Sequence, residues 1–121
     1  MLLSNLKMLV RNATKKTIIA DNARLCNGIF SKLIGLMFSK KQNKALIFKF
    51  DKEKIISLHM LFVFYPIDVL FLGKNKTVVD KKENFRPFTF YKSRKKAVYA
   101  VELPHGTIKK TKTGAGDKIK F

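Results

Sequence analysis

The feature that most constrains the fold is a stretch without lysine or arginine, residues 55–73, in a chain where 26 of 121 residues are Lys or Arg. A run of this length and hydropathy could cross a bilayer as a helix. However, it contains Asp68, and a carboxylate inside a membrane is costly. Its Ile, Val, Phe and Tyr residues favour strands, and Pro66 cannot donate a hydrogen bond to a sheet ladder. The stretch therefore predicts two buried strands separated near Tyr65 and Pro66, with no stable membrane insertion.

Short strand-like runs separated by turn residues make up most of the remaining chain. Charged residues 51–54 and the glycine-containing residues 73–76 are typical of turns between them. Closely spaced short strands indicate an antiparallel sandwich or a small barrel. The further candidate strands are residues 7–11, 17–20, 45–50, 77–80, 97–103 and 118–121.

One segment has helical periodicity instead. Asn22 is suited to an N-cap, because its side chain can accept a hydrogen bond from the first helical turn. From Ala23 onward, apolar residues recur every three or four positions until Gly35. The predicted fold class is therefore α+β, mainly antiparallel β: a small barrel or sandwich with one packed amphipathic helix. The length predicts a single domain over residues 1–121.

The charge balance suggests a polyanionic partner. The chain has 26 Lys and Arg against 8 Asp and Glu, a net charge of +18, which favours contact with RNA, DNA or an anionic surface. Only four of these cations are arginines, the residues that bind phosphate bidentately. The abundance of Lys, Ile, Asn and Phe is also what an AT-rich genome produces. The charge thus has a functional explanation and a compositional one.

Cysteine content and the first residues limit the class of protein further. Cys26 is the only cysteine, which excludes a disulfide framework and a cysteine-based zinc site. Residues 1–10 lack the continuous apolar core and the small-residue cleavage site of a signal peptide. We therefore expect a cytoplasmic protein, and nothing in the sequence indicates a metal or a cofactor.

Four short motifs carry a resemblance to a known family. In chain order they are Gly35-Leu36-Met37-Phe38; His59-Met60 followed by Pro66-Ile67-Asp68-Val69-Leu70-Phe71; Val101-Glu102-Leu103-Pro104 with Gly106; and Gly116-Asp117. Over about residues 17–121 the chain resembles the domain-of-unknown-function family 192, also called uncharacterised protein family 0127. The resemblance implies a small, largely antiparallel β domain and no established reaction.

The chain departs from the pattern of that family at one motif. The family usually has Trp-Met-x-Asn-Thr ahead of Pro-Leu-Asp, whereas this chain has His59, Phe62 and Val63 in place of the Trp, Asn and Thr. If the Asn-Thr pair serves a polar ligand in other members, this chain lacks that contact.

His59 and Asp68 are polar residues inside apolar runs, where a buried polar group must be hydrogen-bonded or functional. On sequential strands they could approach each other as a ligand-binding pair, or as a general base oriented by the Asp. Alternatively, His59 bonds a backbone carbonyl, and Asp68 caps a turn or accepts backbone N–H bonds. Glu102 shares a strand face with Val98 and Ala100. It would either pair with Asp68 in a two-carboxylate site or face solvent among lysines.

The leading functional prediction is a non-catalytic β domain that binds a small polar ligand or a protein partner. The predicted cleft is lined by His59, Met60, Asp68 and Glu102. A hydrolase that uses Asp68 or Glu102 ranks last among the alternatives, so the sequence favours binding over catalysis.

The second prediction is binding of RNA or another polyanion through the lysine-rich surface. Residues 86–96 interleave aromatic and cationic side chains, which can stack on bases and contact phosphates if the rings are exposed. If the rings face the core instead, the cations merely line a loop. The candidate residues are Arg86, Tyr91, Lys92, Arg94, Lys95 and Lys96, accompanied by Phe88 and Phe90.

Overall fold

A computed structural model describes residues 7–26, 45–60 and 64–121. Strands dominate these ranges, and their helix content is a single turn, α2 (Thr107–Lys110). No helix in the described ranges is both long and apolar enough to span a bilayer. The strands are β1 (Met8–Asn12), β2 (Thr17–Cys26), β3 (Leu46–Lys54), β4 (Ser57–His59), β5 (Ile67–Leu72), β6 (Val78–Phe85), β7 (Phe90–Lys92), β8 (Ala97–Pro104) and β9 (Ile119–Lys120).

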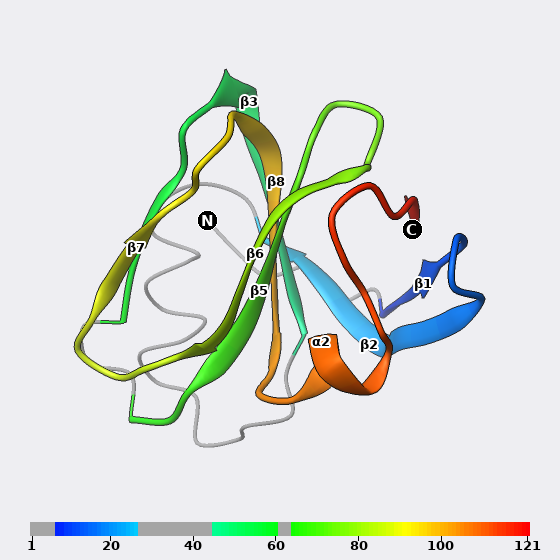
Figure 1. Ribbon diagram of the computed structural model, residues 1–121, viewed down its shortest axis with the longest axis horizontal. Coiled ribbons are helices and arrows are strands. Elements are labelled where there is room, and N and C mark those ends of the chain that lie inside the picture. Colours follow the sequence, from blue (N-terminus) through cyan, green and yellow to red (C-terminus); the bar gives the residue numbers. More distant parts are fainter. Residues whose placement is uncertain (1–6, 27–44, 61–63) are drawn as a thin grey trace.

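Seven strands form one strongly curled sheet in the order β6-β5-β8-β3-β2-β1-β9 (Figure 1). All neighbours are antiparallel except β2 and β3, which pair in parallel. The C-terminal segment joins the two ends of this sheet. The Val78 N–H donates to the Asp117 carbonyl, and the Ile119 N–H donates to the Lys76 carbonyl, each at 2.9 Å. The sheet itself is a curled half-barrel whose two ends this segment bridges, so the predicted barrel is present in this form and the sandwich alternative is not confirmed.

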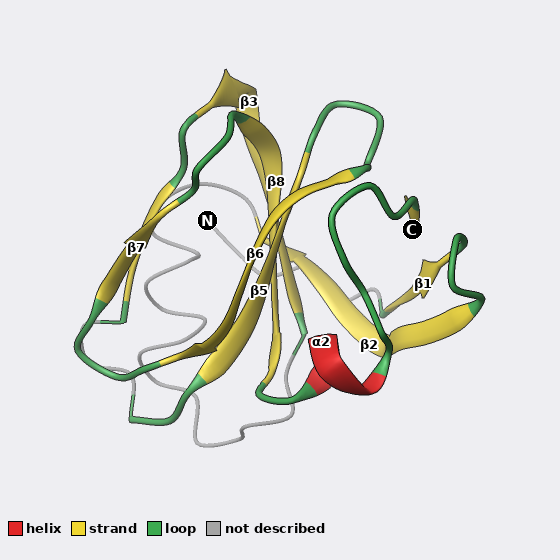
Figure 2. Ribbon diagram, in the orientation of Figure 1, coloured by secondary structure: helices red, strands yellow, loops and turns green. Residues whose placement is uncertain are grey.

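The other two strands, β4 and β7, form a separate antiparallel pair beside the large sheet (Figure 2). Leu58 lies opposite Tyr91, and His59 lies opposite Phe90. Backbone hydrogen bonds lengthen the pair at both ends, from Met60 to Thr89 and from residue 93 to residue 56. We call residues 56–60 with residues 86–96 the β4–β7 ribbon.

The central strands of the large sheet are buried on both faces. Side chains alternate along a strand, so Val69 and Phe71 of β5 pack into one apolar cluster, and Leu70 and Leu72 pack into another. The ribbon covers the first cluster through Leu58 and the ring of Tyr91. Strands β1 and β9 and helix α2 cover the second cluster. Burial on both faces explains why β5 and β8 are continuous apolar runs in the sequence.

The prediction of two buried strands in the cation-free stretch agrees with the described structure in part, because β5 is buried throughout whereas Ser57 and His59 of β4 are exposed. The stretch contains β4 and β5, and Pro66 immediately precedes β5. Residues 61–63 lie outside the described ranges. The predicted charged turn at residues 51–54 is wrong, because β3 continues to Lys54, which pairs with Ala97 of β8.

The predicted start of the amphipathic helix is also wrong. Asn22 and the four residues after it continue strand β2. Residues 24–26 pair with residues 46–48 of β3, and this non-local pairing outweighs the local helical periodicity. The remainder of the predicted helix, and the motif at residues 35–38, fall outside the described residues.

Candidate functional site

The four residues of the predicted ligand cleft do not converge. His59 is exposed, whereas Met60 beside it is completely buried in the first apolar cluster. Asp68 pairs with Leu103 and Glu102 pairs with Val69, so the two carboxylates are one ladder position apart. Because side chains alternate, Asp68 and Glu102 project to opposite faces of the sheet. They therefore cannot form the predicted two-carboxylate site, and Glu102 is buried rather than facing solvent.

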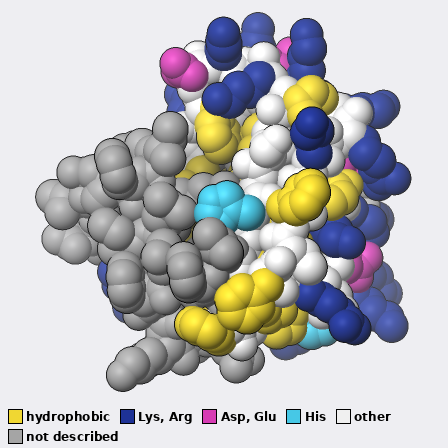
Figure 3. Space-filling view, turned by 90° about the vertical axis from the view of Figure 1, so that its left-hand side faces the viewer, with side chains coloured by type: hydrophobic (Ala, Val, Ile, Leu, Met, Phe, Trp, Pro, Cys, Tyr) yellow, Lys and Arg dark blue, Asp and Glu magenta, His cyan; other side chains and the backbone are white. Residues whose placement is uncertain are grey.

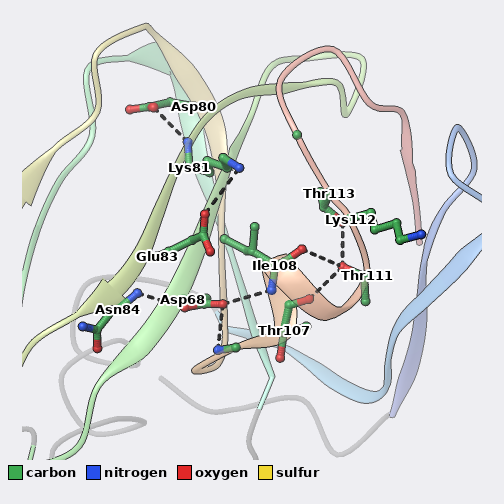
Figure 4. Close-up of polar contacts among 12 residues, drawn as sticks. Asp68, Asp80, Lys81, Glu83, Asn84, Thr107, Ile108, Thr111, Lys112 and Thr113 are labelled. Carbon is green, nitrogen blue, oxygen red and sulfur yellow. Dashed lines mark hydrogen bonds and ion pairs between the residues drawn. The ribbon is translucent and has the colours of Figure 1, made fainter.

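Asp68 instead stabilises the turn after β8 (Figure 4). Its Oδ2 accepts the backbone N–H groups of Gly106 at 3.0 Å and Ile108 at 2.9 Å. Its Oδ1 accepts the N–H of Asn84 at 3.0 Å, and Nδ1 of His105 lies 3.4 Å from the same oxygen. Gly106 and Asn84 have φ values of 93° and 51°, so the carboxylate holds two left-handed residues, one in the turn after β8 and one within β6. This arrangement agrees with the alternative in which Asp68 accepts backbone N–H bonds and stabilises a turn.

Asp117, in the last of the four motifs, fastens the C-terminal segment to β1. Its Oδ2 accepts hydrogen bonds from the Asn12 side chain and from Lys15 Nζ at 2.9 Å, and from the Gly114 N–H at 3.0 Å. Burial raises the pKa of Asp117, but these hydrogen bonds lower it by more, and the net pKa lies below its ordinary value. Two motif carboxylates, Asp68 and Asp117, therefore hold the fold together.

A third buried carboxylate, Asp80, anchors the ribbon to β6. Its oxygens accept hydrogen bonds from the Tyr91 hydroxyl at 2.7 Å, from the Arg94 N–H at 2.9 Å, and from Arg94 Nη2 at 2.9 Å. Burial raises the pKa of Asp80, while the bonds from Arg94, Tyr91 and the backbone lower it by more, to a value below the ordinary one. Asp80 belongs to none of the four motifs, and nothing in the lysine-rich sequence around it predicts that it is buried.

This anchor changes the roles of two predicted RNA-binding residues. Tyr91 points inward, where its ring lies 5.7 Å from that of Phe71, and its hydroxyl bonds Asp80. Arg94 forms an ion pair with Asp80 at 2.9 Å, which offsets its charge. Tyr91 and Arg94 therefore position the ribbon.

The other predicted residues lie exposed on the ribbon or next to it. Since Leu58 and Tyr91 point inward, alternation directs His59 and Phe90 outward. Phe90 is 79% exposed and Phe88 is 59% exposed. Apolar side chains lie beside Lys and Arg side chains on the face of the molecule that carries β7 (Figure 3). The alternative in which the rings of residues 86–96 face the core is therefore wrong for Phe88 and Phe90 and holds for Tyr91. The exposed cations are Arg86, Lys92, Lys95 and Lys96.

Burial makes the surface more basic than the composition alone suggests. No described lysine or arginine is buried, so cations outnumber acids at the surface by more than they do in the sequence. Four of the eight acidic residues are buried: Asp68, Asp80, Glu102 and Asp117.

Comparisons with known proteins agree with this fold. Residues 10–121 match the family model DUF192, described as an uncharacterized ACR. A UPF0127 protein of Pyrococcus furiosus is 37% identical over 112 residues, which cover 91% of this chain and 95% of the relative. A UPF0127 protein of Pyrococcus horikoshii is 34% identical over 115 residues, which cover 93% and 98%.

Two crystal structures share the fold at low sequence identity. A Sinorhizobium meliloti protein superposes with a TM-score of 0.80 at 23% identity, covering 93% of this chain and 89% of its own. A protein of unknown function from Novosphingobium aromaticivorans has a TM-score of 0.80 at 18% identity, covering 93% and 82%. The family model, the relatives and the four motifs lead to one conclusion: the chain belongs to the uncharacterised family DUF192, also named UPF0127.

Proposed function

We propose that this protein binds RNA through the basic surface of the β4–β7 ribbon. The observation that carries the proposal is the exposure of aromatic and cationic side chains together on one anchored ribbon, Phe88 and Phe90 with Arg86 and Lys92. Residues 86–96 contain no acidic residue. A phosphate backbone along this segment would therefore meet lysine and arginine without repulsion from an acidic residue of the same segment.

The burial of carboxylates supports the same partner. Acidic residues that are withdrawn into structural hydrogen bonds do not repel a polyanion at the surface. Asp80 in particular lies directly beneath the ribbon, where it is 4% exposed and paired with Arg94. The predicted ligand cleft has no comparable support, because Asp68 and Glu102 project to opposite faces of the large sheet and the exposed His59 lies on the ribbon.

Binding of a labelled single-stranded RNA across a salt series tests the proposal. The test variant replaces Lys92, Lys95 and Lys96 by Gln. The matched control replaces Lys109, Lys110 and Lys112 by Gln; these lysines are also exposed but lie on α2 and the turn after it. Both variants remove three positive charges, so a general charge effect would be the same in each.

We expect binding that persists at physiological salt and declines linearly in a plot of log affinity against log salt. Each phosphate contact contributes about 0.7 to the magnitude of that slope for single strands, so the slope of the ribbon variant should be smaller than that of the wild type by about 2. The α2 variant should keep most of its slope and affinity. Equal losses in both variants would contradict a site on the ribbon. Absence of binding at physiological salt would contradict the proposed function and leave the charge as compositional.

A further inference from the structure

Three phenylalanine rings are exposed on the ribbon or beside it. Phe64, Phe88 and Phe90 are 72%, 59% and 79% exposed. The rings of Phe64 and Phe88 meet edge to face, with centroids 5.6 Å apart. Phe90 lies directly opposite His59 in the ladder, and both side chains point outward. Isolated exposed apolar residues are common, but a group of rings at the surface marks an interaction site.

The backbone conformation of Phe88, which lies in the turn before β7 and donates its N–H to the Met60 carbonyl at 2.8 Å, is a second observation. Its φ is 62°, in the left-handed region that bulky side chains rarely adopt. Glycine would take this conformation without steric cost. The ring of Phe88 is exposed, so burial in the core does not offset the strain. Strained backbone that carries an exposed side chain is typical of a binding site.

Cations flank these rings on both sides. Arg86 precedes Phe88 by two residues, and Lys92 follows Phe90 by two residues, and all four side chains are exposed. Aromatic rings beside cations suit a ligand that has both flat faces and negative charge. Bases of a single strand offer their faces for stacking, whereas those of a duplex are already stacked on each other.

We propose that the outer face of the β4–β7 ribbon is a base-stacking site that selects single-stranded RNA over duplex RNA and over polyanions without bases. Phe88 and Phe90 provide the stacking surfaces, and Arg86 and Lys92 contact the flanking phosphates. This inference rests on the proposed function and adds selectivity to it. Charge alone binds all polyanions, so the rings are responsible for the discrimination.

Three fluorescent probes of about twelve nucleotides separate stacking from charge. They are a mixed-sequence single-stranded RNA, its duplex with the complementary strand, and an abasic oligomer with the same number of phosphates. Fluorescence anisotropy with the full chain at physiological salt gives the three affinities. We expect the single strand to bind about tenfold or more tighter than the abasic oligomer, since each stacked base contributes that much.

The variants Phe90→Ala and Phe88→Gly should bring the ratio of these two affinities close to one without changing the affinity for the abasic oligomer. Ile18→Ala is the matched control, because Ile18 is 63% exposed and lies on β2, in the other sheet. That control should keep the wild-type ratio. Thermal melting of each variant confirms that the fold is retained.

The other outcomes are distinguishable. If the three probes bind equally and all weaken with salt, the stacking site is overturned while RNA binding through charge stands. If a preference for the single strand survives both phenylalanine substitutions, the placement of the site on this face is overturned. If none of the probes binds at physiological salt, the proposed function fails, and the inference fails with it.

Discussion

Asp68 connects β5 to Asn84 of β6 and to the turn after β8, and the effect of removing its charge can be worked out from its hydrogen bonds. Its two oxygens accept three backbone N–H groups, from Asn84, Gly106 and Ile108. Asparagine has nearly the same shape but only one acceptor oxygen, so at least one N–H group would face the amide NH2. An unsatisfied buried donor costs about 1–3 kcal/mol. The remaining bonds lose their ionic assistance, roughly 1 kcal/mol each. Asp68→Asn should therefore destabilise the protein by about 3–5 kcal/mol.

Urea denaturation followed by circular dichroism measures this loss as a difference in unfolding free energy. Domains of this size have a stability of about 5–15 kcal/mol, so the variant should melt about 10 °C or more below the wild type. Asp21→Asn is the control, because Asp21 is an exposed residue on β2, and it should change stability by less than about 0.5 kcal/mol. If Asp68→Asn is as stable as this control, the carboxylate does not anchor β6 and the turn after β8. A folded variant with reduced RNA affinity would assign Asp68 to binding instead.

Three further variants test other parts of the structure. The folded pKa of Asp80 lies below the ordinary 3.8, so the stabilisation by its carboxylate is present above that pH and is lost as pH falls. In urea denaturation at several pH values, the difference in unfolding free energy between wild type and Asp80→Asn should therefore narrow toward a pH of about 3. A difference that stays constant with pH would contradict the ion pair. Phe88→Gly removes a left-handed strain and should leave stability unchanged or raise it by about 1 kcal/mol; a clear loss in thermal melting would show that the ring serves the fold. Asn12→Ala removes a bond to Asp117 and should speed hydrogen exchange at the amides of Val78 and Ile119, which join the ends of the sheet; unchanged exchange would mean that Asp117 does not fasten this segment.

Most strands could be predicted because their signals are local. Apolar runs bounded by turn residues marked β5 and β8, and the turn at residues 73–76 separated β5 from β6. The errors occurred where pairing between distant residues determined the conformation. Pairing with β3 keeps residues 24–26 in a strand, and pairing with β8 extends β3 through residues 51–54. Neither pairing leaves a pattern in the segment itself.

The candidate site was less predictable, because side-chain direction depends on register. A difference of one ladder position places Asp68 and Glu102 on opposite faces of the sheet, and no local pattern fixes that register. The direction of the Phe90 side chain could not be predicted for the same reason: it depends on how β7 pairs with β4, and phenylalanine side chains more often face the core. Asp80 bonds Tyr91 and Arg94, which lie 11 and 14 residues later, so its anchoring role depends on the fold.

The ribbon surface as the place of RNA contact can be tested most directly by lysine footprinting. The full chain is treated with an amine-reactive reagent at physiological salt, with and without a single-stranded RNA of about twelve nucleotides, and each lysine is quantified by mass spectrometry. We expect Lys92, Lys95 and Lys96 to lose reactivity when RNA is present, while Lys109, Lys110 and Lys112 keep theirs. Uniform protection of all six lysines, or protection confined to the second group, would contradict a binding site on the β4–β7 ribbon.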